Sequence, residues 1–351
     1  MKKAIYIGSL LPFTGKSIIS LAIASIIKEK NMNVSYFKPY GSFPVLYGDV
    51  YADQDAVIAK DTLGLECDIK DLSPIVLTQD LKIRGLKGEL PSQMKKIEQS
   101  FNSICNKTDF VIVGGANYLA NGAFLGISGY DIINKLNLST ILVENMDPDL
   151  LVDPALVTAL KLKGKLDGII LNKVKPEAMD FAKEIIVPFL NKNGIEVIGI
   201  IPESKMLAAV SMSEIKDVLS ARVVASEEFV EKNYPEKIMI GAMDVESALR
   251  HFRKVHNKVV ITGGHRSDII LAALETATEG TVVTGGVVPG EIILAKAEER
   301  NVPVLMTNDD TFSVVDKIEA ILGKARISDA GRIQKGIELV KEYVNFDKIL
   351  E

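Results

Sequence analysis

The fold of this chain is constrained most by a strand, a glycine-containing turn and a helix that opens with Gly15-Lys16-Ser17. An apolar run at 4–7 precedes the turn, and a helically spaced apolar run at 18–27 follows it. At a helix start the first N–H groups have no partner within the helix, and the helix dipole favours negative charge there. This context predicts a phosphate-binding loop. The alternative is an ordinary strand–helix turn with a surface lysine.

Each residue of the turn has an expected role. Lys16 supplies a positive charge for β- and γ-phosphates, and the Ser17 hydroxyl is placed to ligate Mg²⁺. The main-chain amides around Thr14, Gly15 and Ile18 complete the nest in which a polyphosphate would bind. The sequence therefore predicts a nucleotide site with Mg²⁺ at the start of the first helix.

Composition and charge narrow the classes of function. The 351 residues suffice for two or three compact domains. A net charge of −5 attracts neither nucleic acid nor anionic lipid. Two cysteines without a Cys/His cluster disfavour a disulfide framework and a zinc site. Because no apolar run is long enough to span a membrane, we expect a cytoplasmic protein that binds neither nucleic acid nor membrane.

Residues 1–205 alternate short apolar strands with helical stretches. Strands rich in Val and Ile are expected at 4–8, 34–37, 110–113, 140–143, 168–171 and 197–201. Strands of this composition are buried on both faces and belong to parallel sheets covered by helices. We therefore expect an α/β domain with a doubly wound, mostly parallel sheet, and ligands beyond the carboxyl ends of its strands.

A second, smaller α/β domain is expected at 206–325, followed by a C-terminal helix at 326–351. Several strands of the second domain end in Gly or Thr-Gly-Gly, and they are expected at 237–240, 259–262, 281–284 and 304–307. The C-terminal helix is amphipathic, with an apolar face formed by Ile333, Ile337, Val340 and Val344. It either covers the core of its own chain, which we expect, or joins a partner.

Charged side chains follow the second strand and precede the next helix. Lys38 could neutralise phosphates, or it could be a solvated lysine at a strand end. The paired carboxylates of Asp53 and Asp55 are expected in a loop before a helical stretch at 56–60. One of them can hold hydrated Mg²⁺ opposite Ser17, and we expect Asp55 in this role. The alternative for both is helix capping.

Two further strand ends carry candidate ligand groups. Gly114 ends the third strand where P-loop proteins often have an acidic residue. Together with Gly115 it allows a close backbone approach, or simply makes a tight turn. At another strand end the Asn172 amide can pair with a purine edge, and the Lys173 stem can lie over a base. We expect nucleotide base recognition there.

These motifs resemble two known domains in the order in which one family carries them. The first unit resembles the dethiobiotin-synthetase-like P-loop domain at the N-terminus of long bacterial phosphotransacetylases, on the strength of Gly15-Lys16-Ser17, Lys38-Pro39, Asp53-Gln54-Asp55, residues 114–119 and Asn172-Lys173-Val174. The second unit resembles the DRTGG domain, through Gly241-Ala242-Met243, residues 260–269, Thr284-Gly285-Gly286 and Asp310-Thr311-Phe312. The resemblance covers nearly the whole chain.

The resemblance implies roles for individual residues. Lys16 and Ser17 match the phosphate and Mg²⁺ positions, and Asp55 matches a metal-associated aspartate. Lys38 matches a lysine that lies beside the carboxylated substrate of dethiobiotin synthetase. Asn172 matches an asparagine that contacts the base. Any phosphoryl chemistry would therefore use Lys16 and Lys38 as its catalytic groups.

The chain also departs from the family pattern. Dethiobiotin synthetase and many relatives carry a glutamate, a Mg²⁺ partner, where this chain has Gly114. Leu10 and Leu11 replace loop residues that are usually small or polar, and His265-Arg266 stands where the second domain usually has Asp-Arg. These departures disfavour efficient ATP turnover but leave nucleotide binding in place.

The sequence thus predicts an ATP-binding regulatory or sensor protein, whose second unit mediates a homodimer or homo-oligomer and binds a second small ligand. One alternative is an ATP- and Mg-dependent ligase or cyclase that acts on a small carboxylate. Another is a scaffold that keeps the fold without binding nucleotide. In the family the acetyltransferase domain follows these two domains, so we expect no acetyl transfer from the 351 residues, and at most slow ATP hydrolysis.

Overall fold

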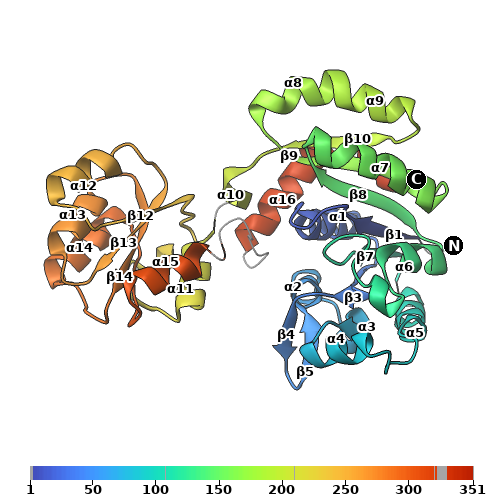
Figure 1. Cartoon of the computed structure of the whole chain (residues 1–351), viewed down its shortest axis with the longest axis horizontal. Helices are drawn as coiled ribbons and strands as arrows, with labels where there is room; N and C mark the ends of the chain where they lie inside the picture. The colour runs from blue at the N-terminus through green and yellow to red at the C-terminus, as the bar shows by residue number, and fades with distance from the viewer. Residues whose placement is uncertain (1–2, 107, 209, 320, 322–329, 351) are drawn as a thin grey trace. The chain divides into compact units, whose positions relative to one another are not determined.

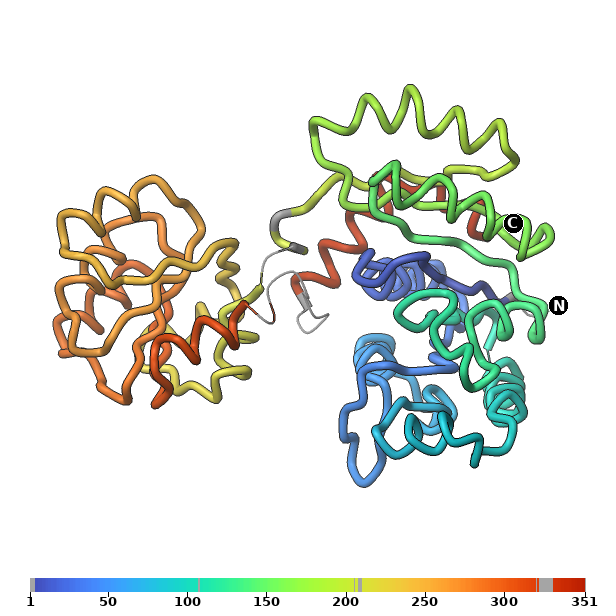
Figure 2. The backbone as a smooth tube through the Cα atoms, viewed as in Figure 1, coloured from blue at the N-terminus to red at the C-terminus, as the bar shows by residue number. Residues whose placement is uncertain are grey.

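The structure is a computed structural model that describes residues 3–106, 108–208, 210–319, 321 and 330–350. The chain divides into two compact units. Unit 1 comprises Met1–Glu203 and Ile327–Glu351, and unit 2 comprises Ser204–Arg326. Figure 1 labels many of the elements of each unit, and Figure 2 traces the backbone in the same view.

Unit 1 is built on a six-stranded sheet in the order β10-β9-β8-β1-β7-β2, and every neighbouring pair is parallel. The sequence-predicted strands are all present, and the doubly wound α/β class is confirmed. Since β1 pairs with both β7 and β8, the residues after β1 leave the sheet in its interior. The strands are β1 (Lys3–Gly8), β2 (Val34–Phe37), β7 (Phe110–Gly114), β8 (Ser139–Asn145), β9 (Leu166–Val174) and β10 (Val197–Pro202).

Helices cover both faces of this sheet. Alternate strand residues, such as Val111, Leu142 and Ile169, join one large apolar cluster. Helices on that face are α5 (Met94–Cys105), α6 (Gly129–Leu136), α7 (Pro148–Leu162), α8 (Met179–Phe181), the π-helical segment Ala182–Ile186 and α9 (Val187–Lys192). Helix α1 (Lys16–Glu29) contacts β1, β2, β7 and β8 and buries residues outside that cluster, which places it on the other face.

The segment between β2 and β7 holds small elements that the sequence did not predict. An antiparallel hairpin and a short parallel pair lie there. Asp53 ends a strand and Asp55 lies in the first turn of a helix, so their expected position in a loop is wrong. The elements are β3 (Tyr40–Gly41), β4 (Pro44–Tyr47), β5 (Val50–Asp53), α2 (Gln54–Leu63), α3 (Ile69–Leu72), β6 (Ile75–Val76) and α4 (Gln79–Leu86).

The C-terminal helices α16 (Ala330–Tyr343) and α17 (Asp347–Leu350) belong to unit 1. Helix α16 packs on α1 and on β10, and three of the four residues of its expected apolar face are buried. Beyond α16, the Asn345 N–H donates to the carbonyl of Ile198, so the chain end also binds the edge strand β10. The C-terminal helix therefore covers its own unit.

Unit 2 is a smaller α/β sheet in the order β11-β15-β14-β13-β12, parallel except for β11. Its expected strands are present, and β11 was not predicted. The strands are β11 (Arg222–Ala225), β12 (Lys237–Ile240), β13 (Lys258–Gly263), β14 (Thr278–Thr284) and β15 (Val304–Met306). The helices are α10 (Lys205–Ala208), α11 (Met212–Leu219), α12 (Val245–Phe252), α13 (Ser267–Leu274), α14 (Glu291–Arg300) and α15 (Thr311–Glu319).

Close packing of α16 on α1 depends on Gly336. A Cβ at this position would lie 2.6 Å from Cγ2 of Ile18. We expect Gly336→Val to lower the free energy of unfolding by about 1–3 kcal/mol, because the helices must separate to admit the side chain. Urea denaturation of the full chain measures this, with Gln334→Val on the exposed side of α16 as the control. Equal stability of the two variants would contradict the packing.

Candidate functional site

The loop that leads from β1 to α1 ends at a position that favours glycine. Gly15 caps α1 with φ 88°, in the left-handed region. A Cβ there would lie 2.5 Å from the Asn172 Nδ2 atom, so a side chain would be strained in its backbone conformation and would displace the Asn172 amide. The first turn of α1 contains no acidic residue. Because α1 follows β1, the N–H groups of this turn lie at the carboxyl edge of the sheet, at the positive end of the helix dipole.

Two residues at the end of β9 hold the backbone of this loop. The Asn172 Nδ2 atom donates to the carbonyl of Thr14 at 2.8 Å, and Lys173 Nζ donates to the carbonyl of Phe13 at 2.7 Å. Phe13 and Lys173 both have positive φ, an uncommon conformation for side-chain-bearing residues that often marks functional sites. The residues expected to contact a base thus lie beside the loop and fix its shape; base contact by them stays a prediction.

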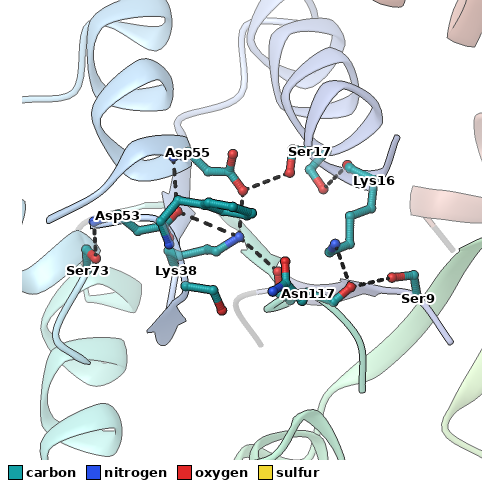
Figure 3. A network of polar contacts seen from close by, with 12 residues as sticks. Ser9, Lys16, Ser17, Lys38, Asp53, Asp55, Ser73 and Asn117 are labelled. Carbon is teal, nitrogen blue, oxygen red and sulfur yellow. Dashed lines mark hydrogen bonds and ion pairs between the residues drawn. The ribbon is translucent and has the colours of Figure 1, made fainter. Parts of the chain in front are cut away.

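A buried charge cluster lies at the start of α1 (Figure 3). Lys38 Nζ donates to Asp55 Oδ2 at 2.6 Å and to the carbonyl of Gly115 at 2.9 Å, and it lies 3.8 Å from Asp53 Oδ1. The same Asp55 oxygen accepts a hydrogen bond from Ser17 Oγ at 2.8 Å. The fold therefore brings together Ser17, Lys38 and Asp55, which are far apart in the sequence. Lys38 is 3% exposed and is not a solvated lysine.

Each charge in this cluster sets the pKa of its neighbours. Burial alone would lower the pKa of Lys38, but Asp55 and Asp53 outweigh burial and raise it. Burial would likewise raise the pKa of Asp55, but the Lys38 ammonium outweighs it, so that pKa is lowered. For Asp53, burial prevails over Lys38 and raises the pKa. Lys38 and Asp55 therefore form an ion pair at neutral pH.

Asp53 also caps the N-terminus of helix α2. Its side chain accepts hydrogen bonds from the N–H groups of Asp55 and Phe43, and its own N–H binds the Ser73 hydroxyl. This is the capping geometry that was the alternative to metal binding.

Lys16 has a different environment. Its Nζ donates to the carbonyl of Asn117 at 3.0 Å, and the side chain is 8% exposed. Burial, followed by repulsion from Lys38, lowers the pKa of Lys16 to about 8. A polyphosphate beside this ammonium would favour the charged form.

Glu144, near the end of β8, lies beside the phosphate loop but belongs to no motif predicted from the sequence. It is 2% exposed, and its Oε1 accepts a hydrogen bond from the N–H of Leu10 at 2.6 Å. Burial raises its pKa to about 8, against the opposing effects of the Leu10 amide and of Lys16. An acid directly after the apolar residues of a predicted strand was the sequence signal that could have found it.

The space at Gly114 is filled by Tyr36 of the neighbouring strand β2. A Cβ at 114 would overlap the Tyr36 hydroxyl and lie 2.7 Å from its Cζ atom. Tyr36 is 2% exposed, and burial raises the pKa of its hydroxyl. An acidic side chain at 114 would therefore require Tyr36 to move.

The donor atoms present fit Mg²⁺ bound together with a nucleotide. Mg²⁺ is usually held by one or two protein ligands, with water and phosphate oxygens completing the shell. The Ser17 hydroxyl and the Asp55 carboxylate are such ligands, and they lie side by side. In the part of the chain that the structure describes, no group of three His, Cys, Asp or Glu residues could hold a metal by itself.

Comparison with known proteins identifies the family. The profile of a P-loop family described as an AAA domain matches residues 3–211, and the chain belongs to this family. The profile of the DRTGG domain matches residues 214–321. Both expected domain resemblances are thereby confirmed.

Curated relatives are of two kinds, phosphate acetyltransferases and dethiobiotin synthetases. The phosphate acetyltransferase of Synechocystis sp. is 23% identical over 368 residues, covering 100% of this chain and 52% of the relative. The ATP-dependent dethiobiotin synthetase BioD of Methanococcus vannielii is 27% identical over 198 residues, covering 54% of this chain and 89% of the relative. The chain thus spans about half the length of the acetyltransferases it matches.

Solved structures include similar chains. The cell division protein MinD of Aquifex aeolicus is 18% identical and covers 58% of this chain and 84% of its own, with a TM-score of 0.36. The CBS and DRTGG domains of Clostridium perfringens pyrophosphatase, complexed with diadenosine tetraphosphate, are 22% identical and cover 46% and 77%, with a TM-score of 0.29. None of the helices among the described residues has the length and apolar character needed to cross a membrane.

The Lys38 cluster predicts a pH-dependent stability effect. We expect Lys38→Met to lower the free energy of unfolding by about 3–5 kcal/mol near neutral pH, because it leaves buried carboxylates without their counter-charge. In the parent, the lowered pKa of Asp55 stabilises the fold above the pKa that this group has when unfolded, and this contribution is lost as the pH falls through the folded value. The difference between variant and parent should therefore shrink in acid.

Urea denaturation over a pH series measures this effect. Lys135→Met is the matched control, because Lys135 forms an exposed ion pair with Glu98. It should cost no more than about 1 kcal/mol. Equal losses in the two variants, or a loss that does not depend on pH, would contradict the pairing of Lys38 with Asp55.

Proposed function

We propose that unit 1 binds ATP or a related nucleotide with Mg²⁺, and that the protein is a nucleotide-dependent regulatory or sensor protein rather than an efficient ATPase. The observation that carries this proposal is the meeting of Lys16, Ser17, Lys38 and Asp55 at the start of α1. Two cations and a Mg²⁺-compatible pair of oxygens lie where helix amides attract an anion.

In this proposal the roles follow from position. Lys16 reaches the β- and γ-phosphates, and the amides of residues 14–18 bind the phosphate oxygens. Ser17 and Asp55 hold Mg²⁺, which offsets the phosphate charge when bound. Lys38 is a further cation for transferred or substrate phosphate. Asn172 and Lys173, which lie beside the loop, would contact the base.

Slow turnover is inferred from Gly114 and Tyr36. Dethiobiotin synthetase and many relatives have a glutamate at the position of Gly114, and Tyr36 fills that space in this chain. A buried phenol whose pKa is raised stays neutral and cannot replace a carboxylate as a counter-charge for Mg²⁺. Binding without rapid hydrolysis suits a sensor.

The match to the DRTGG domain supports the second part of the proposal. Unit 2 would mediate a homodimer or homo-oligomer and bind a second small ligand, in a cytoplasmic protein. The carboxyl ends of β13 and β14 are the expected place for that ligand, since both strands end beside glycine turns at the same edge of a parallel sheet.

Thermal unfolding with Mg-ATP tests nucleotide binding. The unfolding temperature of the parent should rise with the Mg-ATP concentration, because a ligand that binds only the folded state stabilises it. Lys16→Ala should lose this gain, because it removes the cation nearest the β- and γ-phosphates. Lys192→Ala, at an exposed position, should behave like the parent. No shift in the parent would favour the scaffold alternative, and a full shift in Lys16→Ala would contradict the site assignment.

A double variant tests the reason for slow turnover. Gly114→Glu alone should lose about 1–3 kcal/mol of unfolding free energy through its overlap with Tyr36. The double variant Gly114→Glu/Tyr36→Val should recover part of this lost stability, as expected for residues in contact. It should also hydrolyse ATP faster than the parent.

Urea denaturation and phosphate release measure the two effects, with Tyr36→Val alone as the control. Strictly additive stability losses would contradict the contact. Fast hydrolysis in the parent when small carboxylates are added would favour the ligase alternative over the sensor.

A further inference from the structure

Glu144 lies on the other side of β1 from Gly114 and contacts the start of the phosphate loop. In the parallel pairing, β8 places Leu142 beside Gly8, so Glu144 lies just beyond the point where β1 ends. Its carboxyl group accepts a hydrogen bond from the N–H of Leu10 at 2.6 Å. The residue thus tethers the first turn of the loop to the sheet.

The surroundings of Glu144 contain one dominant charge. Burial raises the pKa of Glu144, and the ammonium of Lys16, from α1, acts on it in the opposite direction. Lys38, Asp53 and Asp55 act on Lys16 in turn. On its other neighbour, β9, the residue paired with Glu144 is the apolar Leu171. At the same edge, Lys173 of β9 donates to the loop carbonyl of Phe13, and burial lowers the pKa of Lys173 against the opposing effect of Glu203, which follows β10.

A polyphosphate bound at Lys16 would meet this carboxylate. Two anions would then share one ammonium in a water-poor site, where like charges cannot both stay ionised without cost. The phosphate keeps most of its charge, because its last ionisation, with a pKa of about 6, lies below that of the buried glutamate. The group that yields is Glu144, which can take a proton from solvent and remain an acceptor for Leu10 through its other lone pairs.

We propose that Glu144 is a positioning residue of the phosphate loop and that its carboxylate competes with polyphosphate for Lys16, so that the nucleotide binds together with a proton on Glu144. This inference rests on the nucleotide binding proposed above. One proton is taken up on binding. The protein with ionised Glu144 combines with nucleotide and this proton to form a complex in which Glu144 is neutral. Affinity should therefore fall as rising pH ionises Glu144.

The relevant pH range is set by burial. The pKa of Glu144 is raised to about 8 before any ligand binds, so ionisation falls within the range where the protein can be studied. Lys16 complicates the experiment, because its pKa is lowered to about 8 and phosphate would also favour its protonated form. The contribution of Glu144 is therefore measured as the difference between the parent and variants at this residue.

Titration calorimetry separates the contributions. Mg-ATP and inorganic pyrophosphate are the probes, measured at about pH 7 and about pH 9 in buffers of different protonation heat. Glu144→Gln keeps an acceptor for Leu10 but cannot ionise, whereas Glu144→Leu loses both the charge and the tether. Glu177→Gln, at an exposed position, is the control.

The parent and the control should lose about tenfold more affinity than Glu144→Gln between the two pH values, as expected for one pKa unit of coupling. Glu144→Gln should also take up fewer protons on binding. Near pH 7 Glu144→Leu should bind more weakly than Glu144→Gln, because the loop has lost its tether.

The same pH dependence and proton uptake in parent and Glu144→Gln would overturn the inference and leave the proposed function intact. Equal binding by the glutamine and leucine variants would overturn the positioning role. If the parent binds neither Mg-ATP nor pyrophosphate, the proposed function fails, and the inference fails with it.

Discussion

The parallel pairing of β1 with β7 on one side and β8 on the other is the constraint on which the site depends. Parallel strands have their carboxyl ends at one edge of the sheet. Residues that are distant in sequence, at the ends of β7 and β8, therefore lie on both sides of the loop after β1. The β7 side supplies the backbone around Gly114 and the Asn117 carbonyl that binds Lys16. The β8 side supplies Glu144. The loop has its shape because these strand ends are fixed by the sheet.

Charge neutralisation explains why such a polar site can be buried. Lys38 is surrounded by two carboxylates and a carbonyl, and each buried group satisfies another. Buried ions tolerate desolvation only when they are paired in this way. The same pairing keeps Asp55 ionised beside the Ser17 hydroxyl, so the oxygens that suit Mg²⁺ are held in place before any ligand arrives. Positioning in advance lowers the ordering cost of binding.

The fold could be predicted from sequence because strong local patterns agree with it. The core strands of both units are short Val- and Ile-rich runs, and the Gly-Lys-Ser turn fixes the first strand–helix unit. The hairpin β4–β5 escaped prediction because its strands are short and partly exposed, so they lack the apolar signature. The edge strand β11 escaped for the same reason. Its register on β15 is set by tertiary contacts that no local window contains.

The candidate site was predictable only in part. Lys16, Ser17, Lys38 and Asp55 were found because each lies beside a recognisable motif, although the ion pair that buries Lys38 was not foreseen. Glu144 and Tyr36 belong to no motif, and their importance lies in what adjacent strands bring next to them. Spatial neighbours of this kind depend on strand order, which the sequence alone did not specify.

The account rests on an anion-binding nest at the start of α1, and a crystal structure grown with Mg-ATP tests it most directly. We predict continuous density for a polyphosphate against the amides of residues 14–18, with Lys16 turned from the Asn117 carbonyl toward the phosphates and a metal between the phosphates and Ser17. A structure from crystals soaked at saturating Mg-ATP in which this nest holds no anion, with Lys16 still bound to Asn117, would contradict the account.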